Sequence, residues 1–201
     1  MNFRECRYLI LSDFYRITGN TSSRSLSREL LFGSSYKYNF WMRFCRYART
    51  SNILIKWLIY PIARLMLGHY TYKLGISVPY TIDIGSGFYI GHYGGIVVNA
   101  FSHIGKNCNI SHGVTLAEAN RGRNKGYPTI GDNVYIGPGA KIIGAVKVGN
   151  HVAIGANCVL TRNVPDHAVV VGVPGKVISY QGSEGYVEKT DYEDKLKHLI
   201  K

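Results

Sequence analysis

Aliphatic residues recur every six positions between Ile84 and Leu160, and this period constrains the fold more than any other feature of the chain. The repeating positions, called anchors below, are Ile84, Ile90, Ile96, Ile104, Ile110, Leu116, Ile130, Ile136, Ile142, Val148, Ile154 and Leu160. Neither the 3.6-residue period of a helix nor the two-residue period of a strand explains this spacing. A period of six is typical of a parallel β-helix, in which each unit is a short strand and a turn.

Three such units make one triangular coil, so the twelve anchors predict a mainly β fold of about four coils. Compact residues expected inside the prism follow four positions after an anchor: Ala100, Cys108, Val114, Val134, Ala140, Val146, Val152 and Cys158. Two intervals are irregular. The eight residues from Ile96 to Ile104 predict a two-residue bulge at a corner, and the fourteen from Leu116 to Ile130 predict an extruded loop over about 117–129.

The chain before the repeat is predicted to be helical. Its apolar periodicity indicates helices over 3–18, 25–31, 38–49 and 53–73, the last broken at Pro61. Ser25 or Ser27 is the candidate N-cap of the second helix. We therefore expect a basic helical region over 1–75, a β-helix over 76–180 and a C-terminal tail over 181–201. Residues 192–200 fit either a helix or a mobile tail.

The positive charge of the chain is concentrated in this helical region. Residues 1–75 hold 12 Lys and Arg against 3 Asp and Glu, a balance of +9 within a total of +12. Such a patch fits a solvated helical face, a nucleic-acid site or a surface for anionic lipid. We expect no nucleic-acid partner, because the sequence has no recognition helix or stacking motif. Aromatic and aliphatic residues are interleaved with the charges, which favours the lipid surface.

Cysteine spacing and hydropathy bear on cofactors and location. The four cysteines have no metal-ligand spacing, and Cys108 and Cys158 fall on compact positions of the repeat. We therefore expect no metal and no disulfide framework. The N-terminus lacks a signal-peptide pattern, and the apolar run over 53–67 is short and interrupted by Lys56 and Arg64. The predicted location is the cytoplasm, with peripheral attachment to the inner membrane as a further option.

Two histidines occupy equivalent positions on successive coils. His92 follows Ile90 by two residues, and His112 follows Ile110 by two. We therefore expect the two imidazoles in one column, about one strand spacing of 4.8 Å apart. Imidazole is a suitable general base for a hydroxyl group at neutral pH. The alternative, that one or both are polar corner residues without a chemical role, is more open for His112 than for His92.

The repeat resembles the left-handed β-helix acyltransferases, a hexapeptide-repeat family that uses acetyl-CoA, and within it the serine acetyltransferase branch. The resemblance covers 76–180 and is carried by Tyr89-Ile-Gly-His-Tyr-Gly-Gly-Ile-Val-Val98, Val114-Thr-Leu116, Tyr127-Pro-Thr-Ile-Gly-Asp-Asn-Val-Tyr-Ile-Gly-Pro-Gly-Ala-Lys-Ile-Ile-Gly144 and Val171-Gly-Val-Pro-Gly-Lys176. It implies a left-handed coil, a homotrimer, acetyl-CoA as co-substrate and a catalytic base at His92. The implied CoA contacts are Pro138, Ala156, Thr161, Arg162 and Lys176.

The chain departs from that family around the acceptor. The aspartate that supports the histidine is replaced by Ser77, or by Asp83 if the register slips, and a second acidic residue by Gly91. The arginine–histidine pair of the loop is replaced by Gly126 and Tyr127. Because a free amino acid needs fixed opposite charges, these departures favour a sugar hydroxyl, on a capsule or lipopolysaccharide precursor.

Two alternatives remain open: a serine O-acetyltransferase of cysteine biosynthesis, and a non-catalytic β-helix scaffold. The candidate acceptor contacts are Tyr93, Asn99, Arg121 and Tyr127. The candidate catalytic residues are His92 and His112.

Overall fold

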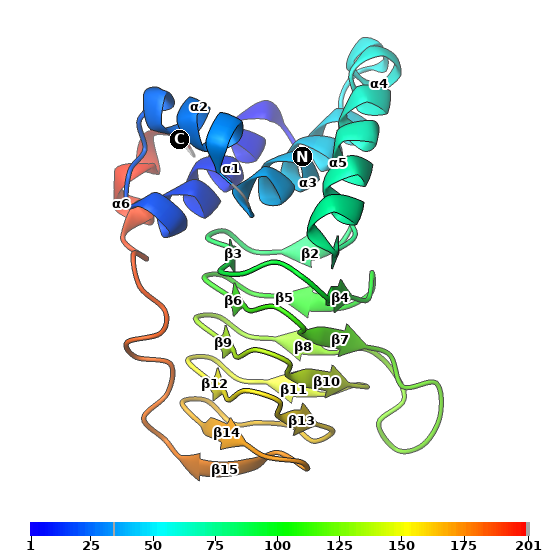
Figure 1. Ribbon diagram of the computed structural model, residues 1–201, viewed down its shortest axis with the longest axis vertical. Helices are drawn as coiled ribbons and strands as arrows, with labels where there is room; N and C mark the ends of the chain where they lie inside the picture. The colour runs from blue at the N-terminus through cyan, green and yellow to red at the C-terminus, as the bar shows by residue number, and fades with distance from the viewer. Residues whose placement is uncertain (34, 200–201) are drawn as a thin grey trace.

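The computed structural model describes residues 1–33 and 35–199, and it places a head of helices on one end of a triangular β-prism (Figure 1). The helices are α1 (Phe3–Thr18), α2 (Ser23–Phe32), α3 (Tyr36–Thr50), α4 (Ile53–Leu58), α5 (Tyr60–Leu74), α6 (Tyr192–Lys195) and a 3₁₀ turn (Lys197–Leu199). One hydrophobic core runs from α3 and α5 into the prism. The division between a helical region and a β-helix at residue 75 stays a prediction, because the two parts share this core.

Three sheets form the faces of the prism. Sheet A contains β1 (Ile76–Ser77), β4 (Ile96–Val98), β7 (Thr115–Ala117), β10 (Lys141–Ile143) and β13 (Val159–Leu160). Sheet B contains β2 (Asp83–Ile84), β5 (His103–Ile104), β8 (Thr129–Ile130) and β11 (Lys147–Val148). Sheet C contains β3 (Tyr89–Ile90), β6 (Asn109–Ile110), β9 (Tyr135–Ile136), β12 (Ala153–Ile154), β14 (Val169–Val171) and β15 (Lys176–Ser179). This is the predicted left-handed parallel β-helix, with β15 added as an antiparallel strand.

The anchors stack in register, as the period predicts. On sheet C, for example, Ile90 pairs with Ile110, Ile110 with Ile136 and Ile136 with Ile154. All of these side chains are buried. Sheets A and C each stack five parallel strands, which is one rung more than the four coils expected. The additional strands are β1, before the first anchor, and β14, after the last.

The two-residue irregularity was assigned to the wrong corner. In the anchor column of sheet A, Val98 rather than Ile96 pairs with Leu116 of β7. Ile96 pairs instead with Ile76 of β1. The two extra residues therefore lie before Ile96. Because Val98 is the anchor, the compact position four residues later is Ser102, which is buried, whereas the predicted Ala100 is exposed.

The longer irregularity is the extruded loop, as expected. It leaves sheet A after β7 and returns at β8, projecting from the side of the prism (Figure 1). A bridge between Ala119 and Gly126 closes its base, and the Ala145 N–H donates to the carbonyl of Asn124 at 2.9 Å. The loop is therefore attached to the rung below it as well as to its own strands.

The helices of the head follow local capping rules. Asn2 caps α1 with a capping box that includes Glu5. Ser22 accepts a hydrogen bond from the Ser25 N–H at the start of α2, so the expectation of Ser25 or Ser27 as N-cap was wrong. The break between α4 and α5 falls at Ile59, two residues before Pro61, which lies in the first turn of α5, where proline is tolerated.

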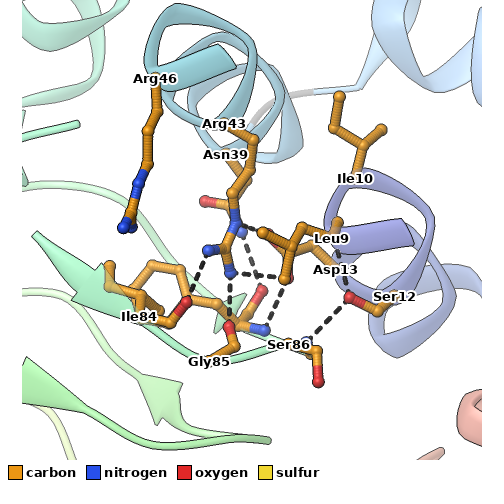
Figure 2. A network of polar contacts seen from close by, with 12 residues as sticks. Leu9, Ile10, Ser12, Asp13, Asn39, Arg43, Arg46, Ile84, Gly85 and Ser86 are labelled. Carbon is orange, nitrogen blue, oxygen red and sulfur yellow. Dashed lines mark hydrogen bonds and ion pairs between the residues drawn. The ribbon is translucent and has the colours of Figure 1, made fainter. Parts of the chain in front are cut away.

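A buried ion pair attaches the head to the first coil (Figure 2). The Arg43 guanidinium contacts the Asp13 carboxylate at 2.9 Å, and both side chains are buried. Arg43 also donates to the carbonyls of Ile84 and Gly85, while Asp13 accepts from the Phe88 N–H at 2.8 Å. Part of the positive charge of the helical region thus satisfies coil carbonyls rather than facing solvent.

The C-terminal segment returns along the prism to the head. The Ser183 N–H donates to the carbonyl of His151 at 3.0 Å, and α6 packs on α1 (Figure 1). Arg16 of α1 donates to the carbonyls of Glu188 and Gly87 and to the Asn109 side chain. Of the helix and the mobile tail considered for 192–200, the structure has a short helix, α6, followed by a 3₁₀ turn, and Ile200 lies outside the described residues.

Candidate functional site

The two histidines and two of the implied CoA contacts form one column along the corner between sheets C and A. His92, His112, Pro138 and Ala156 each lie two residues after an anchor of sheet C, and those anchors pair in sequence. Backbone hydrogen bonds join the turns: the Gly139 N–H donates to the His112 carbonyl at 2.9 Å, and the Asn157 N–H to the Pro138 carbonyl at 2.7 Å. The sequence analysis predicted the alignment of His92 with His112, and the structure shows that Pro138 and Ala156 continue the same column.

The imidazoles of His92 and His112 lie on adjacent rungs, with ring centroids 6.1 Å apart and planes at 76°. Both side chains are exposed. This separation is larger than one strand spacing of about 4.8 Å, as expected for rings tilted relative to each other on adjacent rungs, and both rings face the outside of the prism.

The turn that carries His92 differs from those below it. Five residues, Gly91 to Gly95, separate Ile90 from the next buried position, whereas three residues separate Ile110 from Val114. Gly94 and Gly95 have φ values of 112° and 65°, a region that favours glycine. The displaced two-residue irregularity is therefore located in the turn of the candidate base. Tyr93, in the same turn, is 49% exposed and available to an acceptor.

The carboxylate expected to support His92 is not supplied by Asp83. Asp83 lies on sheet B, where its carboxylate contacts Nδ1 of His103 at 2.9 Å. The suggestion that Asp83 supports His92 after a register slip is therefore wrong. Ser77 lies on the exterior of sheet A, paired with Val97. Within the part of the chain that the structure describes, no hydrogen bond joins His92 to a carboxylate.

The remaining implied CoA contacts lie elsewhere. Thr161 and Arg162 follow β13 at the opposite edge of sheet A from Ala156, and both are exposed. Lys176 begins β15, where it pairs with Val171 below the histidine column. Sheet A therefore separates Thr161 and Arg162 from Pro138 and Ala156 within one chain.

The candidate acceptor residues are also divided between corners. Asn99 follows β4 on the same edge as Thr161, and its side chain accepts from the Phe101 N–H at 2.9 Å. Tyr127, at the end of the extruded loop, packs on Phe101 with ring centroids 5.0 Å apart. Arg121 is exposed on that loop. Only Tyr93 lies in the turn of His92, so one chain does not bring the acceptor residues together.

Two features of this surface were not expected from the sequence. Lys141, on the outer face of sheet A, donates from Nζ to the carbonyl of Gly113, in the turn of His112. The Asn124 amide of the loop donates to the carbonyl of Thr161. A lysine or asparagine at an outward position carries no distinguishing pattern, so no sequence signal identified either contact.

The cysteines are unsuited to covalent catalysis. All four are free and buried. Burial raises the pKa of the Cys108 thiol to about 12 and that of Cys6 to about 12, and it also raises the pKa of Cys158. The thiolate is the nucleophilic form, so these side chains act as core residues, as predicted for Cys108 and Cys158. The described residues hold no cluster of three or more side chains suited to a metal ion.

The chain is similar to known proteins over the β-helix. The family model Bacterial transferase hexapeptide (six repeats) matches residues 127–162. A serine acetyltransferase of Bacillus pumilus is 35% identical over 136 residues, covering 68% of this chain and 63% of the relative. That of Mycobacterium tuberculosis is 43% identical over 104 residues, covering 52% of this chain and 45% of the relative. The chain thus spans about half to two thirds of these relatives.

A solved structure is also similar to this chain in three dimensions. Serine acetyltransferase from Brucella abortus, in complex with coenzyme A, superposes with a TM-score of 0.67 at 25% identity, covering 88% of this chain and 67% of that one. Each of these relatives is named a serine acetyltransferase, and none of their names refers to a sugar acceptor. In sequence and in fold, the chain is similar to these serine acetyltransferases, and residues 127–162 carry the hexapeptide repeat of the matching family within a left-handed β-helix.

Proposed function

We propose that the chain is an acetyl-CoA-dependent O-acetyltransferase whose general base is His92. The observation that carries the proposal is the column of His92, His112, Pro138 and Ala156 along one corner of the prism. A base at one end and small side chains along the same edge are the features required of a site for a long thioester. A non-catalytic scaffold would not require this arrangement.

The residues present are suited to binding acetyl-CoA. Pro138 and Ala156 are compact, and the turns on this corner are rich in glycine, which leaves room for a narrow chain. The exposed cations Arg162 and Lys176 are suited to phosphate groups. Since sheet A separates Arg162 from Ala156, a ligand that contacts both edges lies between two copies of the chain. The proposed assembly is therefore a homotrimer, in which each site has one wall from each of two neighbours.

The chemistry assigned to this chain is proton transfer and charge stabilisation. Acetyl-CoA supplies an activated carbonyl as the second substrate. His92 removes the proton of the acceptor hydroxyl, and the acceptor oxygen forms a bond to the acetyl carbonyl carbon while the C–S bond to CoA breaks. The His92 imidazolium then returns the proton to the departing thiolate. Backbone N–H groups of the glycine-rich turns stabilise the developing oxyanion, an effect that can contribute about 3–4 kcal/mol. With every cysteine buried, direct transfer is favoured over an acyl-enzyme.

L-Serine is the first candidate acceptor, because it is the substrate implied by the names of the relatives. The second candidate is a sugar hydroxyl, and one observation favours it. Asp83 contacts His103, and the positions expected to bind an amino acid are the uncharged Ser77, Gly91, Gly126 and Tyr127. None of the relatives reported above has a name that refers to polysaccharide, so a capsule or lipopolysaccharide precursor has no support from them.

Acetyl transfer to a panel of acceptors tests the proposal and separates the candidates. The purified chain is given acetyl-CoA with L-serine and, in parallel, with nucleotide- and lipid-linked sugars. A kcat/KM for L-serine in the ordinary range of about 10⁴ M⁻¹s⁻¹ or above establishes the serine acceptor. A value far below this, with faster transfer to a sugar, establishes the second candidate. Tight CoA binding without transfer to any acceptor contradicts catalysis at this site.

A further inference from the structure

The far end of the helical head carries an exposed apolar surface that the prism does not cover. It consists of the side chains of Ile53, Leu54, Trp57, Leu58, Ile62 and Leu65, and is called the α4–α5 face below. These side chains are between 58% and 75% exposed. We propose that the α4–α5 face docks the protein onto the surface of an anionic phospholipid bilayer.

α5 already has a buried side, so its part of this face is additional to the core, whereas no residue of α4 is buried. Ala63, Leu67 and Leu74 of α5 are buried in the cluster that continues into the prism. A helix at a protein surface normally has polar residues opposite its buried stripe. In the first half of α5 the side opposite the buried stripe carries the exposed Ile62 and Leu65, and in α4 the apolar side chains are exposed without any buried stripe. Exposing this much apolar surface to water is energetically unfavourable, so the face indicates a binding partner.

The surrounding charge identifies the kind of partner. No Asp or Glu occurs between Glu29 and Asp83, and this stretch contains the cations Lys37, Arg43, Arg46, Arg49, Lys56, Arg64 and Lys73. Lys56 and Arg64 lie within the helices of the face and are exposed. Contact with a second copy of the same face would place cation against cation without a carboxylate between them. An anionic lipid surface attracts the exposed Lys56 and Arg64 while the apolar side chains enter the headgroup boundary.

Composition supports an interfacial position. Trp57 is 71% exposed at the centre of the face. Indole rings favour the boundary between water and lipid because one edge is polar and the rest apolar. In residues 1–33 and 35–199, no helix is both long and apolar enough to cross a membrane. The face is thus suited to lying on a bilayer.

The structure restricts the lipid-binding surface to a smaller part of the helical region than the sequence analysis considered. The sequence analysis considered all of residues 1–75, but Arg16 and Arg43 are buried and donate to coil carbonyls. They are not available to lipid. In Figure 1, α4 lies at the opposite end of the molecule from β15, and the prism with the histidine column lies between them. Docking through the α4–α5 face therefore leaves that column free.

Trp57 provides a direct probe of docking. The chain has two tryptophans, so Trp41→Phe leaves Trp57 as the single reporter. Vesicles of phosphatidylcholine with about 30% phosphatidylglycerol should shift its emission to shorter wavelength, and brominated lipid should quench it. Phosphatidylcholine alone should have little effect. Raising the salt from about 0.1 M to about 1 M should weaken binding, because the Debye length falls from about 10 Å to about 3 Å.

Matched variants of the full chain separate this face from other exposed apolar residues. Trp57→Ser with Leu58→Ser should lower sedimentation with anionic vesicles about tenfold or more, since apolar area is lost. Lys56→Glu should weaken binding to anionic vesicles specifically. The control is Ile178→Ser, which changes an exposed apolar residue of β15 at the opposite end and should bind like the parent. Circular dichroism verifies that each variant is folded.

The proposal is overturned if the parent and the Trp57→Ser, Leu58→Ser variant sediment equally with anionic vesicles. In that case the particle mass of the variant is measured by light scattering without lipid. Equal sedimentation combined with a particle mass smaller than that of the parent would assign the α4–α5 face to contact between copies of the chain.

Discussion

The two histidines of the site differ in the turns that hold them, and this difference predicts unequal roles. His92 lies in the five-residue turn beside Tyr93, whereas His112 lies in a three-residue turn whose Gly113 carbonyl accepts from Lys141. We expect His92→Ala to reduce the rate of acetyl transfer by about 10²–10⁴-fold, the usual contribution of a general base. CoA affinity should change little. His112→Ala should cost less and should mainly raise KM for the acceptor.

Steady-state kinetics and CoA titration of the two variants test this assignment. His103→Ala is the matched control, because His103 is exposed on sheet B and contacts Asp83 away from the column. It should retain the parent rate. An inactive His112→Ala alongside an active His92→Ala would reverse the two roles.

The buried cysteine thiols lead to a second prediction at the scale of single residues. Burial raises the pKa of Cys45 to about 11 and that of Cys108 to about 12, well above the ordinary value of about 8.5. At pH 8 the reactive thiolate fraction is therefore about 10⁻³ or less for these groups. A disulfide reagent should label the native protein very slowly and should label four thiols after unfolding in guanidinium. Rapid labelling of the native chain would contradict the burial.

At the scale of elements, the contact between the head and the first coil depends on the Asp13–Arg43 pair. Arg43→Met leaves a buried carboxylate without its partner and two coil carbonyls without a donor. We expect the free energy of unfolding to fall by about 3–5 kcal/mol. Guanidinium titration followed by circular dichroism measures the change. Arg28→Met, on the exposed side of α2, is the control and should stay within about 0.5 kcal/mol of the parent.

The repeat predicted the elements of the prism well, because burial inside a narrow coil requires an aliphatic side chain at each anchor. It placed one insertion incorrectly because Ile96 and Val98 are both aliphatic and both buried. Only the pairing of Val98 with Leu116 distinguishes the two. The bounds of α1 followed from its apolar period, whereas the N-cap of α2 could not be selected from a run rich in serine.

The part of the site that depends on the strand register was predictable from the sequence. The part that depends on contacts between loops was not. The column of His92 and His112 follows directly from their equal offsets from Ile90 and Ile110. The packing of Phe101 against Tyr127 joins residues 26 positions apart across an irregular loop, so periodicity gave no information about it. Asp83 was a plausible support for His92 in the sequence, but its outward position on sheet B brings it to His103.

At the scale of the whole molecule, the division of the candidate site between two edges of sheet A predicts a trimer. Light scattering should give about three times the chain mass of 22.5 kDa. The physical reason is that Pro138 and Ala156 lie on one edge and Thr161 and Arg162 on the other. A monomer that turns over acetyl-CoA would contradict this assembly and would require a site within one chain.

The contacts of Arg16 have a consequence for the order of events during synthesis. Arg16 belongs to α1, but its guanidinium donates to Gly87, Asn109 and Glu188, the last of which is 172 residues further along the chain. At about 5–20 residues per second, that partner is made roughly 10–30 s later. Until Glu188 is made, the Arg16 guanidinium lacks one of its hydrogen-bond acceptors. The nascent chain therefore completes the contacts of its head only after Glu188 has been made, so a chaperone has an interval of that length in which to bind it.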